Sequence, residues 1–528
     1  MLKNSDFLKK YKNIKKGKSK ELIEVFETER IDRRKNEFKN TKILSDIMTL
    51  NHKKFKAAEL QNNFNIDQLK IIGITGSFGK TSTALLVHRY LQSIGKKSVL
   101  YCSAYVDSPA TWTGRAASFN KIIESKEDLA NILQECIDYK AEYLVLECWE
   151  ASIARGIFDD IKFSLKVLAS FKNNFMNAAY KDKETYFNNK LKFFISDPNC
   201  PILMNLRSDE SESFRYQDFI KKTKNRKYYF NIQKELTPKL KKLNIVVDYS
   251  LEWDTINKEP VLLNFIDKSI FSIKSANYPI QRYSTPLTGW NIDNVLCAFA
   301  ILDIIRVLDI DAFKEFIENP ELYIAGRNQC ITWKDRKIII DHDMLNALLV
   351  AADAKELSAA VEGLSKSEKE RLGITNLFKI NKIRNIITPR SIRISTNKYR
   401  EEYEQKYLAS DSNRILDDFN IEYALTDADA SLYNKFADQV ILNPVNIGNG
   451  DYKAITDFMA SKLTVPTASY QDRFKAILNT LIDSEPGDVI IIGGRANRKL
   501  NTISYDEVVI GSDFDFVNKA IKALDNIM

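Results

Sequence analysis

A glycine-rich run that ends in a lysine and a threonine constrains the fold of this chain more than any other feature. The run reads Thr75-Gly76-Ser77-Phe78-Gly79-Lys80-Thr81-Ser82. It follows an apolar, β-branched stretch at residues 69–74 and precedes a helical pattern over residues 83–91. Strand, glycine turn and helix in this order are typical of a parallel α/β sheet whose loop cradles phosphate with backbone N–H groups.

The residue types of this phosphate loop fit ATP and Mg²⁺. Gly76 and Gly79 allow the backbone to approach phosphate closely. Lys80 would reach the terminal phosphates, and the Thr81 hydroxyl would bind Mg²⁺. We assign the whole run except Phe78 to nucleotide binding. The run departs from the strict Walker pattern at its first glycine, so a chance turn is the alternative, which the flanking strand and helix disfavour.

The 528 residues divide into three predicted parts. Residues 1–66 are polar and Lys-rich and predict a short helical N-terminal region. Residues 67–324 hold apolar strands separated by helices, and residues 325–528 hold a second such series. The expected fold class is therefore α/β, with a central P-loop ATPase-like parallel sheet domain and a C-terminal Rossmann-like domain. Residues 225–290 predict an antiparallel insertion. The other predicted strands are residues 98–101, 143–146, 163–169, 200–205, 337–341, 385–387 and 487–494.

Composition excludes several classes of protein. No run approaches the roughly 18–20 apolar residues of a membrane helix, and the N-terminus lacks the apolar centre of a secretory signal. Six scattered cysteines and three histidines argue against a zinc site or a disulfide framework, and favour the cytoplasm. The net charge is +8. The basic residues 9–18 predict a solvated helix face more strongly than a nucleic-acid or membrane footprint, so no nucleic-acid partner is expected.

Residues 73–83 resemble the nucleotide loop of the Mur ligase family, and later motifs follow in the family's order as far as about residue 500. The resemblance implies an enzyme that activates a carboxylate with ATP as an acyl phosphate and joins it to an amine. It also implies that Glu147, at the end of an apolar strand, binds Mg²⁺, with Glu150 close enough to compete. The carboxyl edge of a parallel sheet is where open α/β folds place function.

Residues 184–194 resemble the helix that carries the family's carbamylated lysine, here Lys190. Phe187, Leu191 and Phe194 form an apolar stripe that includes this lysine. A lysine in apolar surroundings loses solvation, so its pKa falls and the neutral amine can take up CO₂. The alternative is a lysine whose ammonium reaches water from the edge of the stripe. The predicted catalytic residues are Lys80, Glu147 and Lys190, and the predicted metal-binding residues are Thr81, Glu147 and Lys190.

Four more residues enter through the resemblance alone. Asn291 and Asn294, at the start of a helix, would lie beside adenine, although such a pair is otherwise an ordinary helix cap. Arg327 would face ATP at the hinge into the last domain, and Asp341 would contact the nucleotide from a strand end. Residues 471–495 resemble the branch that adds the third stem-peptide residue.

The chain also departs from the family. Asn174, Phe175 and Asn177 replace Asp, His and Asp, so a second Mg²⁺ site would need other groups. Residues 426–429 replace an element that grips diaminopimelate in some members, so recognition of diaminopimelate is not supported. About 70 residues precede the loop, where muramyl-peptide ligases carry a larger domain for a UDP-linked sugar.

Three functions stay open. The leading hypothesis is an ATP-dependent amide ligase that joins a small-molecule or peptide carboxylate to an amino acid or other amine. The second is a cell-wall UDP-N-acetylmuramoyl-peptide ligase with a reduced substrate domain, or one that a partner protein completes. The third is a nucleotide-binding scaffold that has lost catalysis.

Overall fold

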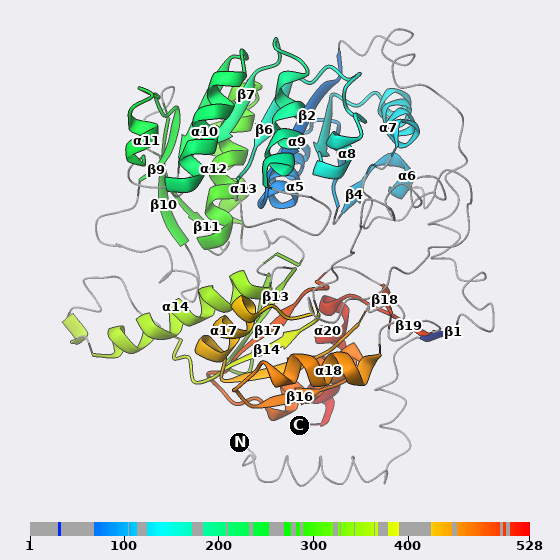
Figure 1. Cartoon of the computed structure of the whole chain (residues 1–528), viewed down its shortest axis with the longest axis vertical. Helices are drawn as coiled ribbons and strands as arrows, with labels where there is room; N and C mark the ends of the chain where they lie inside the picture. Colours follow the sequence, from blue (N-terminus) through cyan, green and yellow to red (C-terminus); the bar gives the residue numbers. More distant parts are fainter. Residues whose placement is uncertain are drawn as a thin grey trace. The chain divides into compact units, whose positions relative to one another are not determined.

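Two separate sheets organise the chain in the computed structural model, each in its own compact unit, with the division near Ala325 (Figure 1). The first unit holds the described residues between 68 and 319 and those between 360 and 378, and the second holds residues 30–32, those between 326 and 359, and those from 379 onward. The structure describes residues 30–32, 68–103, 105–112, 123, 125–171, 183–206, 210–231, 236–252, 269–275, 281–285, 289–319, 326–327, 329–342, 344–363, 365–367, 378–389, 424–445, 451–496, 500–502 and 507–527.

The first unit is built on a ten-stranded sheet of order β11-β10-β9-β8-β7-β6-β2-β5-β3-β4. In this spatial order the seven neighbouring strands β9, β8, β7, β6, β2, β5 and β3 pair in parallel. The outer strands pair antiparallel: β4 with β3, β10 with β9, and β11 with β10. The strands are β2 (Lys70–Thr75), β3 (Ser98–Tyr101), β4 (Val106–Asp107), β5 (Tyr143–Glu147), β6 (Leu165–Leu168), β7 (Ile202–Asn205), β8 (Lys227–Asn231), β9 (Tyr249–Glu252), β10 (Ser269–Ser275) and β11 (Gln281–Thr285).

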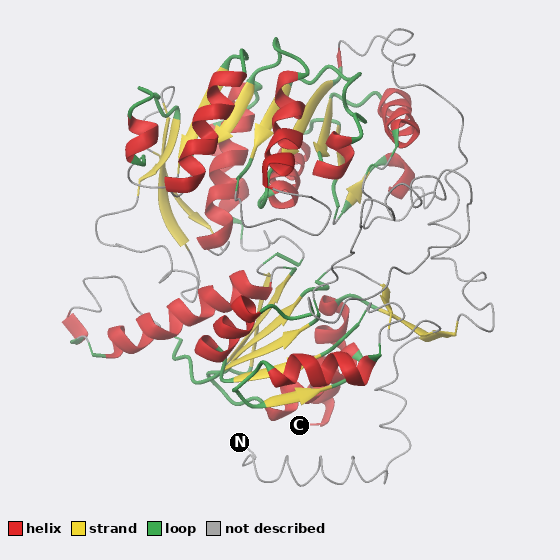
Figure 2. Cartoon of the chain, in the orientation of Figure 1, coloured by secondary structure: helices red, strands yellow, loops and turns green. Residues whose placement is uncertain are grey.

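Helices cover both faces of this sheet (Figure 2). They are α5 (Lys80–Ser93), α6 (Pro109–Trp112), α7 (Lys126–Tyr139), α8 (Glu150–Ala154), α9 (Lys183–Ile195), α10 (Glu210–Lys222), α11 (Pro238–Lys241), α12 (Gly289–Ile304) and α13 (Ile310–Glu318). Side chains alternate along a strand, so β2 supplies both faces. Ile72 and Ile74 pack with α5, α12 and α13, and Ile71 packs in the core of α7, α9 and α10. Strands buried on both sides explain the continuous apolar runs in the sequence.

The second unit contains a six-stranded sheet of order β12-β13-β17-β14-β15-β16, parallel except for β12. A small sheet of β1, β19 and β18 belongs to the same unit. The strands are β1 (Arg30–Asp32), β12 (Gln329–Trp333), β13 (Arg336–Asp341), β14 (Ile383–Ile387), β15 (Gln439–Leu442), β16 (Thr467–Ser469), β17 (Val489–Gly493), β18 (Leu500–Thr502) and β19 (Glu507–Ile510). The helices are α14 (Met344–Glu362), α17 (Asp427–Phe436), α18 (Tyr452–Ser461), α19 (Arg473–Asp483) and α20 (Asp513–Ile527).

The structure confirms the α/β class and corrects two predictions. Residues 225–290 are antiparallel only in part, because β8 and β9 extend the main sheet in parallel before β10 pairs antiparallel with both β9 and β11. Residues 30–32, predicted within a helical region, form strand β1, paired with β19. A backbone partner distant in sequence overrides helix propensity in so short a polar segment. Among the described residues, no helix is both long enough and apolar enough to cross a bilayer.

Candidate active site

The phosphate loop joins the end of β2 to the start of α5. Gly79 is the residue before the helix, with φ 77°, and Gly76 has φ 151°. A Cβ atom on Gly76 would lie 2.8 Å from the backbone nitrogen of Ser170. This positive φ and the close backbone approach require glycine, which explains the composition of the run.

Ser170, two residues after the end of β6, holds the phosphate loop through hydrogen bonds. Its carbonyl oxygen accepts a hydrogen bond from the backbone nitrogen of Ser77 at 3.0 Å. Its Oγ accepts from the backbone nitrogen of Phe78 at 2.7 Å and donates to the Phe78 carbonyl oxygen at 2.9 Å. The sequence carries no signal for this residue, because its role depends on the pairing of β2 with β6.

Thr81 and Glu147, to which the family resemblance gives a role in Mg²⁺ binding, meet at the carboxyl edge of the sheet. The Thr81 hydroxyl donates to Oε2 of Glu147 at 2.8 Å. The same oxygen accepts from the backbone nitrogen and the Oγ of Ser103, at 2.8 and 2.9 Å. Ser103 follows β3, which pairs with β5. The two hydrogen bonds from Ser103 fix the Glu147 carboxylate, and the sequence does not predict them.

Lys80 and Lys190 both approach the carboxylate of Glu150, which opens α8. The Lys80 Nζ lies 3.9 Å from Oε1 of Glu150 and donates to the Gly76 carbonyl oxygen at 2.8 Å. The Lys190 Nζ donates to the same Oε1. Burial opposes ionisation of Glu150, but the charges of Lys190 and Lys80 outweigh it and lower its pKa to about 2.

Lys190 is buried in the apolar stripe of α9. Only 1% of its side chain is exposed, and Phe187, Leu191 and Phe194 are buried with it. Burial lowers the pKa of Lys190, although the neighbouring Glu150 raises it. The ammonium lies 4.8 Å from the ring centroid of Tyr186. The Tyr186 hydroxyl is in turn 2.9 Å from Oγ of Ser77, so α9 contacts the phosphate loop directly.

Asn294 lies beside the loop from α12. Its Oδ1 accepts a 3.5 Å hydrogen bond from the Thr83 hydroxyl, and a Cβ on Gly79 would overlap that oxygen. Asn291 occupies the preceding turn of the same helix. Adenine recognition by these two residues stays a prediction.

Arg327 and Asp341 belong to the second unit, so their contact with a nucleotide held by the first unit stays a prediction. Asp341 ends β13 and is buried, and its carbonyl oxygen accepts from the Gly494 nitrogen at 3.1 Å. Thr426, in the element compared with diaminopimelate binding, caps α17 by accepting from the Asp429 nitrogen at 3.2 Å. Asn174, Phe175 and Asn177 lie outside the described residues.

The chemistry of these groups fits a nucleotide with one divalent cation. The Thr75 hydroxyl, at the end of β2, is buried and has no hydrogen-bond partner among the described residues, which is costly unless a ligand supplies one. No group of three or more His, Cys, Asp or Glu side chains suited to a metal gathers in the described part of the chain. Mg²⁺ is typically bound by one or two protein groups together with phosphate oxygens, and Thr81 and Glu147 are sufficient for that.

Known proteins resemble this chain in sequence and in fold. The family model of the Mur ligase middle domain matches residues 74–302. A UDP-N-acetylmuramoyl-L-alanyl-D-glutamate--2,6-diaminopimelate ligase of Prochlorococcus marinus subsp. pastoris is 28% identical over 131 residues, which is 24% of each chain. The same enzyme of Clostridium botulinum is 27% identical over 209 residues, 38% of this chain and 39% of that one. The matched stretches therefore span between a quarter and two fifths of these relatives.

Solved structures of low identity share the fold. A UDP-N-acetylmuramoyl-L-alanyl-D-glutamate--2,6-diaminopimelate ligase aligns with a TM-score of 0.51 at 15% identity, over 89% of this chain and 81% of that one. FolC of E. coli in complex with DHPP and ADP aligns with a TM-score of 0.52 at 10% identity, over 93% and 97% of the two chains. Residues 74–302 therefore match the Mur ligase middle domain, and the chain is similar to Mur ligases in sequence over that part and in fold over most of its length.

Proposed function

We propose that the chain is an ATP-dependent carbon–nitrogen ligase that joins a carboxylate to an amine. The observation that carries the proposal is the convergence of Thr81 with Glu147, and of Lys80 and Lys190 with Glu150, around one phosphate loop. A loop that only binds a nucleotide needs no buried lysine from a separate helix. The family and its curated relatives support the same reaction class.

The reaction has two steps. A carboxylate oxygen of the acid attacks the γ-phosphorus of ATP, which forms an acyl phosphate and releases ADP. The amine then attacks the acyl carbon, loses a proton, and expels phosphate to leave an amide. Lys80 would stabilise the charge on the transferring phosphoryl group. A Mg²⁺ ion bound by Thr81 and Glu147 would offset charge on the phosphate oxygens.

We expect Glu147→Gln to weaken Mg²⁺ binding specifically. The amide keeps the size of the side chain and an oxygen acceptor for Thr81 and Ser103, but removes the negative charge that a hard cation requires. The Mg²⁺ concentration for half-maximal ADP release should rise by about 10- to 100-fold, as a Mg²⁺ titration at saturating ATP would measure. Glu142→Gln, which changes a partly exposed glutamate just before the other end of β5, serves as control. An unchanged Mg²⁺ requirement in Glu147→Gln would remove Glu147 from the metal site.

We also propose that Lys190 takes up CO₂, as the family resemblance implies. The neutral amine would attack CO₂ and lose a proton, which leaves a carbamate anion. Burial of the amine favours its neutral form. In protein equilibrated with ¹³C-bicarbonate, ¹³C NMR should show a carbamate resonance that is absent from Lys190→Arg. A spectrum without that resonance would mean that Lys190 acts as an ammonium paired with Glu150.

The acid and the amine are defined only by class. The curated relatives are named for a muramyl dipeptide and diaminopimelate, which keeps a cell-wall ligase as the second candidate. Calorimetry with UDP-N-acetylmuramoyl-L-alanyl-D-glutamate would detect that substrate directly. The six cysteines are free thiols, which fits a reducing compartment such as the cytoplasm, where ATP and both substrate classes occur.

The test of the proposed function is a coupled assay of ADP release. A panel of acids (amino acids, short peptides and the muramyl dipeptide nucleotide) is combined with a panel of amines at saturating ATP and Mg²⁺. We expect sustained ADP release only when an acid and an amine are both present. Release that never depends on either panel would favour a nucleotide-binding scaffold.

A further inference from the structure

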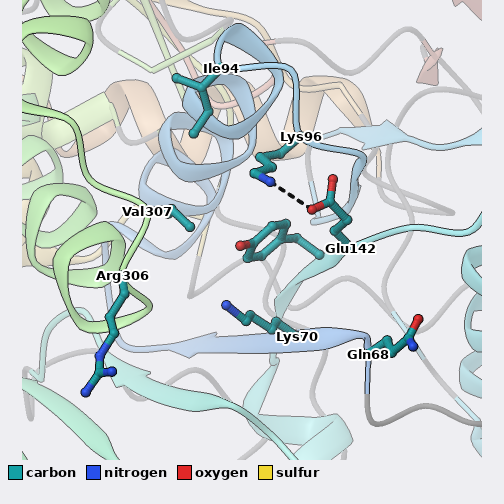
Figure 3. A pocket seen from close by; sticks show the side chains of 8 residues that line it. Gln68, Lys70, Ile94, Lys96, Glu142, Arg306 and Val307 are labelled. Atoms are coloured by element: carbon teal, nitrogen blue, oxygen red, sulfur yellow. Dashed lines mark hydrogen bonds and ion pairs between the residues drawn. The ribbon is translucent and has the colours of Figure 1, made fainter.

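A cavity lies at the opposite edge of the first sheet from the phosphate loop, where β2 and β5 begin (Figure 3). Its volume is about 430 Å³, which is within the range of small-molecule sites. The helix α5 starts in the phosphate loop at Lys80 and reaches this cavity at Ile94. Fourteen residues of α-helix span about 21 Å, so a ligand here would not overlap a nucleotide on the loop.

The charge in this cavity is positive and only partly neutralised. Lys96 and Glu142 form an ion pair with 3.0 Å between Nζ and Oε2. The hydrogen bond between them raises the pKa of Lys96 and lowers the pKa of Glu142, so both side chains are charged and their two charges cancel. The remaining cations are Lys70 and Arg306, and neither forms an ion pair within the described part of the chain.

Arg306 adopts a backbone conformation that usually belongs to glycine. It follows the end of α12 with φ 61°. The backbone nitrogen of Arg306 donates to the Asp303 carbonyl oxygen, and the backbone nitrogen of Val307 donates to the Leu302 carbonyl oxygen. Glycine is the common residue at this helix-end position, because a Cβ is strained there. A strained position occupied by arginine is a reason to look for a role of the guanidinium.

A role in stabilising the end of α12 explains Lys70 but not Arg306. Positive side chains often complement the carbonyl groups at helix C-termini, and Lys70 does so by donating to the Ile305 carbonyl oxygen at 3.5 Å. Its ammonium also lies 5.5 Å from the ring centroid of Tyr143. Helix-end stabilisation does not explain why Arg306 adopts a left-handed backbone conformation, since its guanidinium has no partner among the described residues. It also does not explain the cavity beside Arg306.

We propose that this cavity is a binding site for a small phosphorylated metabolite, with the phosphate held by Arg306 and Lys70. The planar guanidinium bonds two oxygens of a phosphate at once, and Lys70 adds a second positive charge from another element. Ile94 and Val307 line the same cavity and offer apolar surface to the organic part of the ligand.

The experiment is calorimetry on the full chain saturated with ADP and Mg²⁺, so that the phosphate loop is filled. The probes are inorganic phosphate, glucose 6-phosphate and, as a carboxylate of similar charge, citrate. Wild type should bind glucose 6-phosphate more tightly than phosphate and both more tightly than citrate. The variant Arg306→Gly, which suits the φ of 61°, should lower both phosphate affinities at least about tenfold while its melting temperature stays at or above that of wild type.

A matched control is Lys97→Ala, which removes a neighbouring exposed cation that does not line the cavity. It should leave all three affinities unchanged. The proposal is overturned if wild type binds neither phosphate probe, if citrate binds best, or if Arg306→Gly and Lys97→Ala lose the same affinity. These outcomes are binding affinities and do not depend on catalysis, so they can be told apart from a failure of the proposed ligase activity.

Discussion

Lys80→Met should lower ADP release by about a thousandfold while leaving the fold intact. Lys80 is the cation of the phosphate loop, and removal of one group that stabilises transition-state charge costs about 10²–10³ in rate. The variant loses one hydrogen bond, to the Gly76 carbonyl oxygen. Glu150 keeps its partner Lys190, so no buried carboxylate is left alone.

The measurement is the rate of ADP release at saturating ATP, with Lys97→Met as the matched control. Lys97 is an exposed lysine of the same unit, and its ammonium lies 5.3 Å from the ring centroid of Tyr139. Its replacement should leave the rate unchanged. Melting curves of both variants should overlay that of wild type. Full activity in Lys80→Met would mean that the phosphate loop does not serve the reaction.

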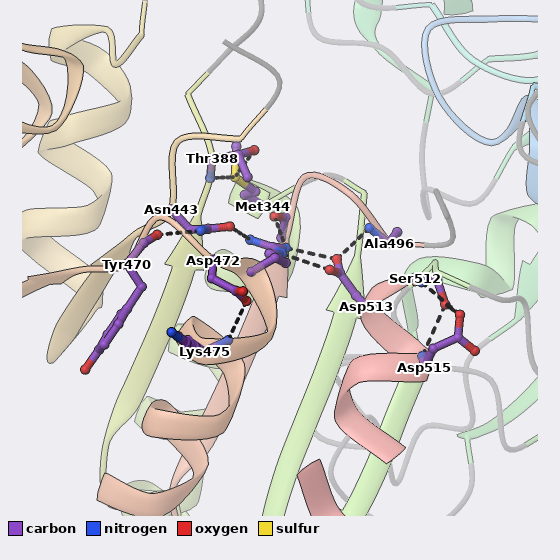
Figure 4. A network of polar contacts seen from close by, with 12 residues as sticks. Met344, Thr388, Asn443, Tyr470, Asp472, Lys475, Ala496, Ser512, Asp513 and Asp515 are labelled. Atoms are coloured by element: carbon purple, nitrogen blue, oxygen red, sulfur yellow. Dashed lines mark hydrogen bonds and ion pairs between the residues drawn. The ribbon is translucent and has the colours of Figure 1, made fainter. Parts of the chain in front are cut away.

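Arg473→Met should be the most destabilising single substitution in the second unit. Arg473 is fully buried and donates two hydrogen bonds to the Asp513 carboxylate, at 2.8 and 2.9 Å. Figure 4 shows the polar network that includes Asp513 and Asn443. It also donates to the Gly493 carbonyl oxygen at 2.8 Å and to Asn443 Oδ1 at 3.3 Å. Loss of the guanidinium leaves the Asp513 charge buried and unpaired, which costs about 3–5 kcal/mol.

Hydrogen exchange of the α19 and α20 peptides would measure this loss locally, because these helices carry Arg473 and Asp513. The double variant Arg473→Met with Asp513→Leu removes both charges and should recover part of the stability. Lys453→Met, which breaks an exposed pair with Asp457, is the control and should change exchange little. If Arg473→Met and Lys453→Met behave alike, the network does not stabilise this unit.

The sequence predicts those parts of the site that local chemistry dictates. The glycines of the phosphate loop, Lys80 and Thr81 follow from one strand–turn–helix motif, and Lys190 follows from the family resemblance together with its place in an apolar stripe. The structure places Lys190 in the core and Thr81 on Glu147. In each case the neighbours that matter lie on one element or on adjacent strands.

The remaining contacts depend on pairing between distant segments. Ser103 and Ser170 are ordinary loop serines in the sequence, and they reach Glu147 and the phosphate loop only because β3 and β6 flank β5 and β2. Strand β15 (Gln439–Leu442) is also not predicted from the sequence. Local patterns do not encode such pairings.

The most direct test of the proposed reaction follows a labelled oxygen. The acid that best stimulates ADP release is prepared with ¹⁸O in its carboxylate and incubated with ATP, Mg²⁺ and its amine. Activation as an acyl phosphate predicts one ¹⁸O atom in the released inorganic phosphate, detected as an isotope shift in ³¹P NMR, with ADP as the nucleotide product. Label in AMP with release of pyrophosphate, or unlabelled phosphate despite amide formation, would contradict the account.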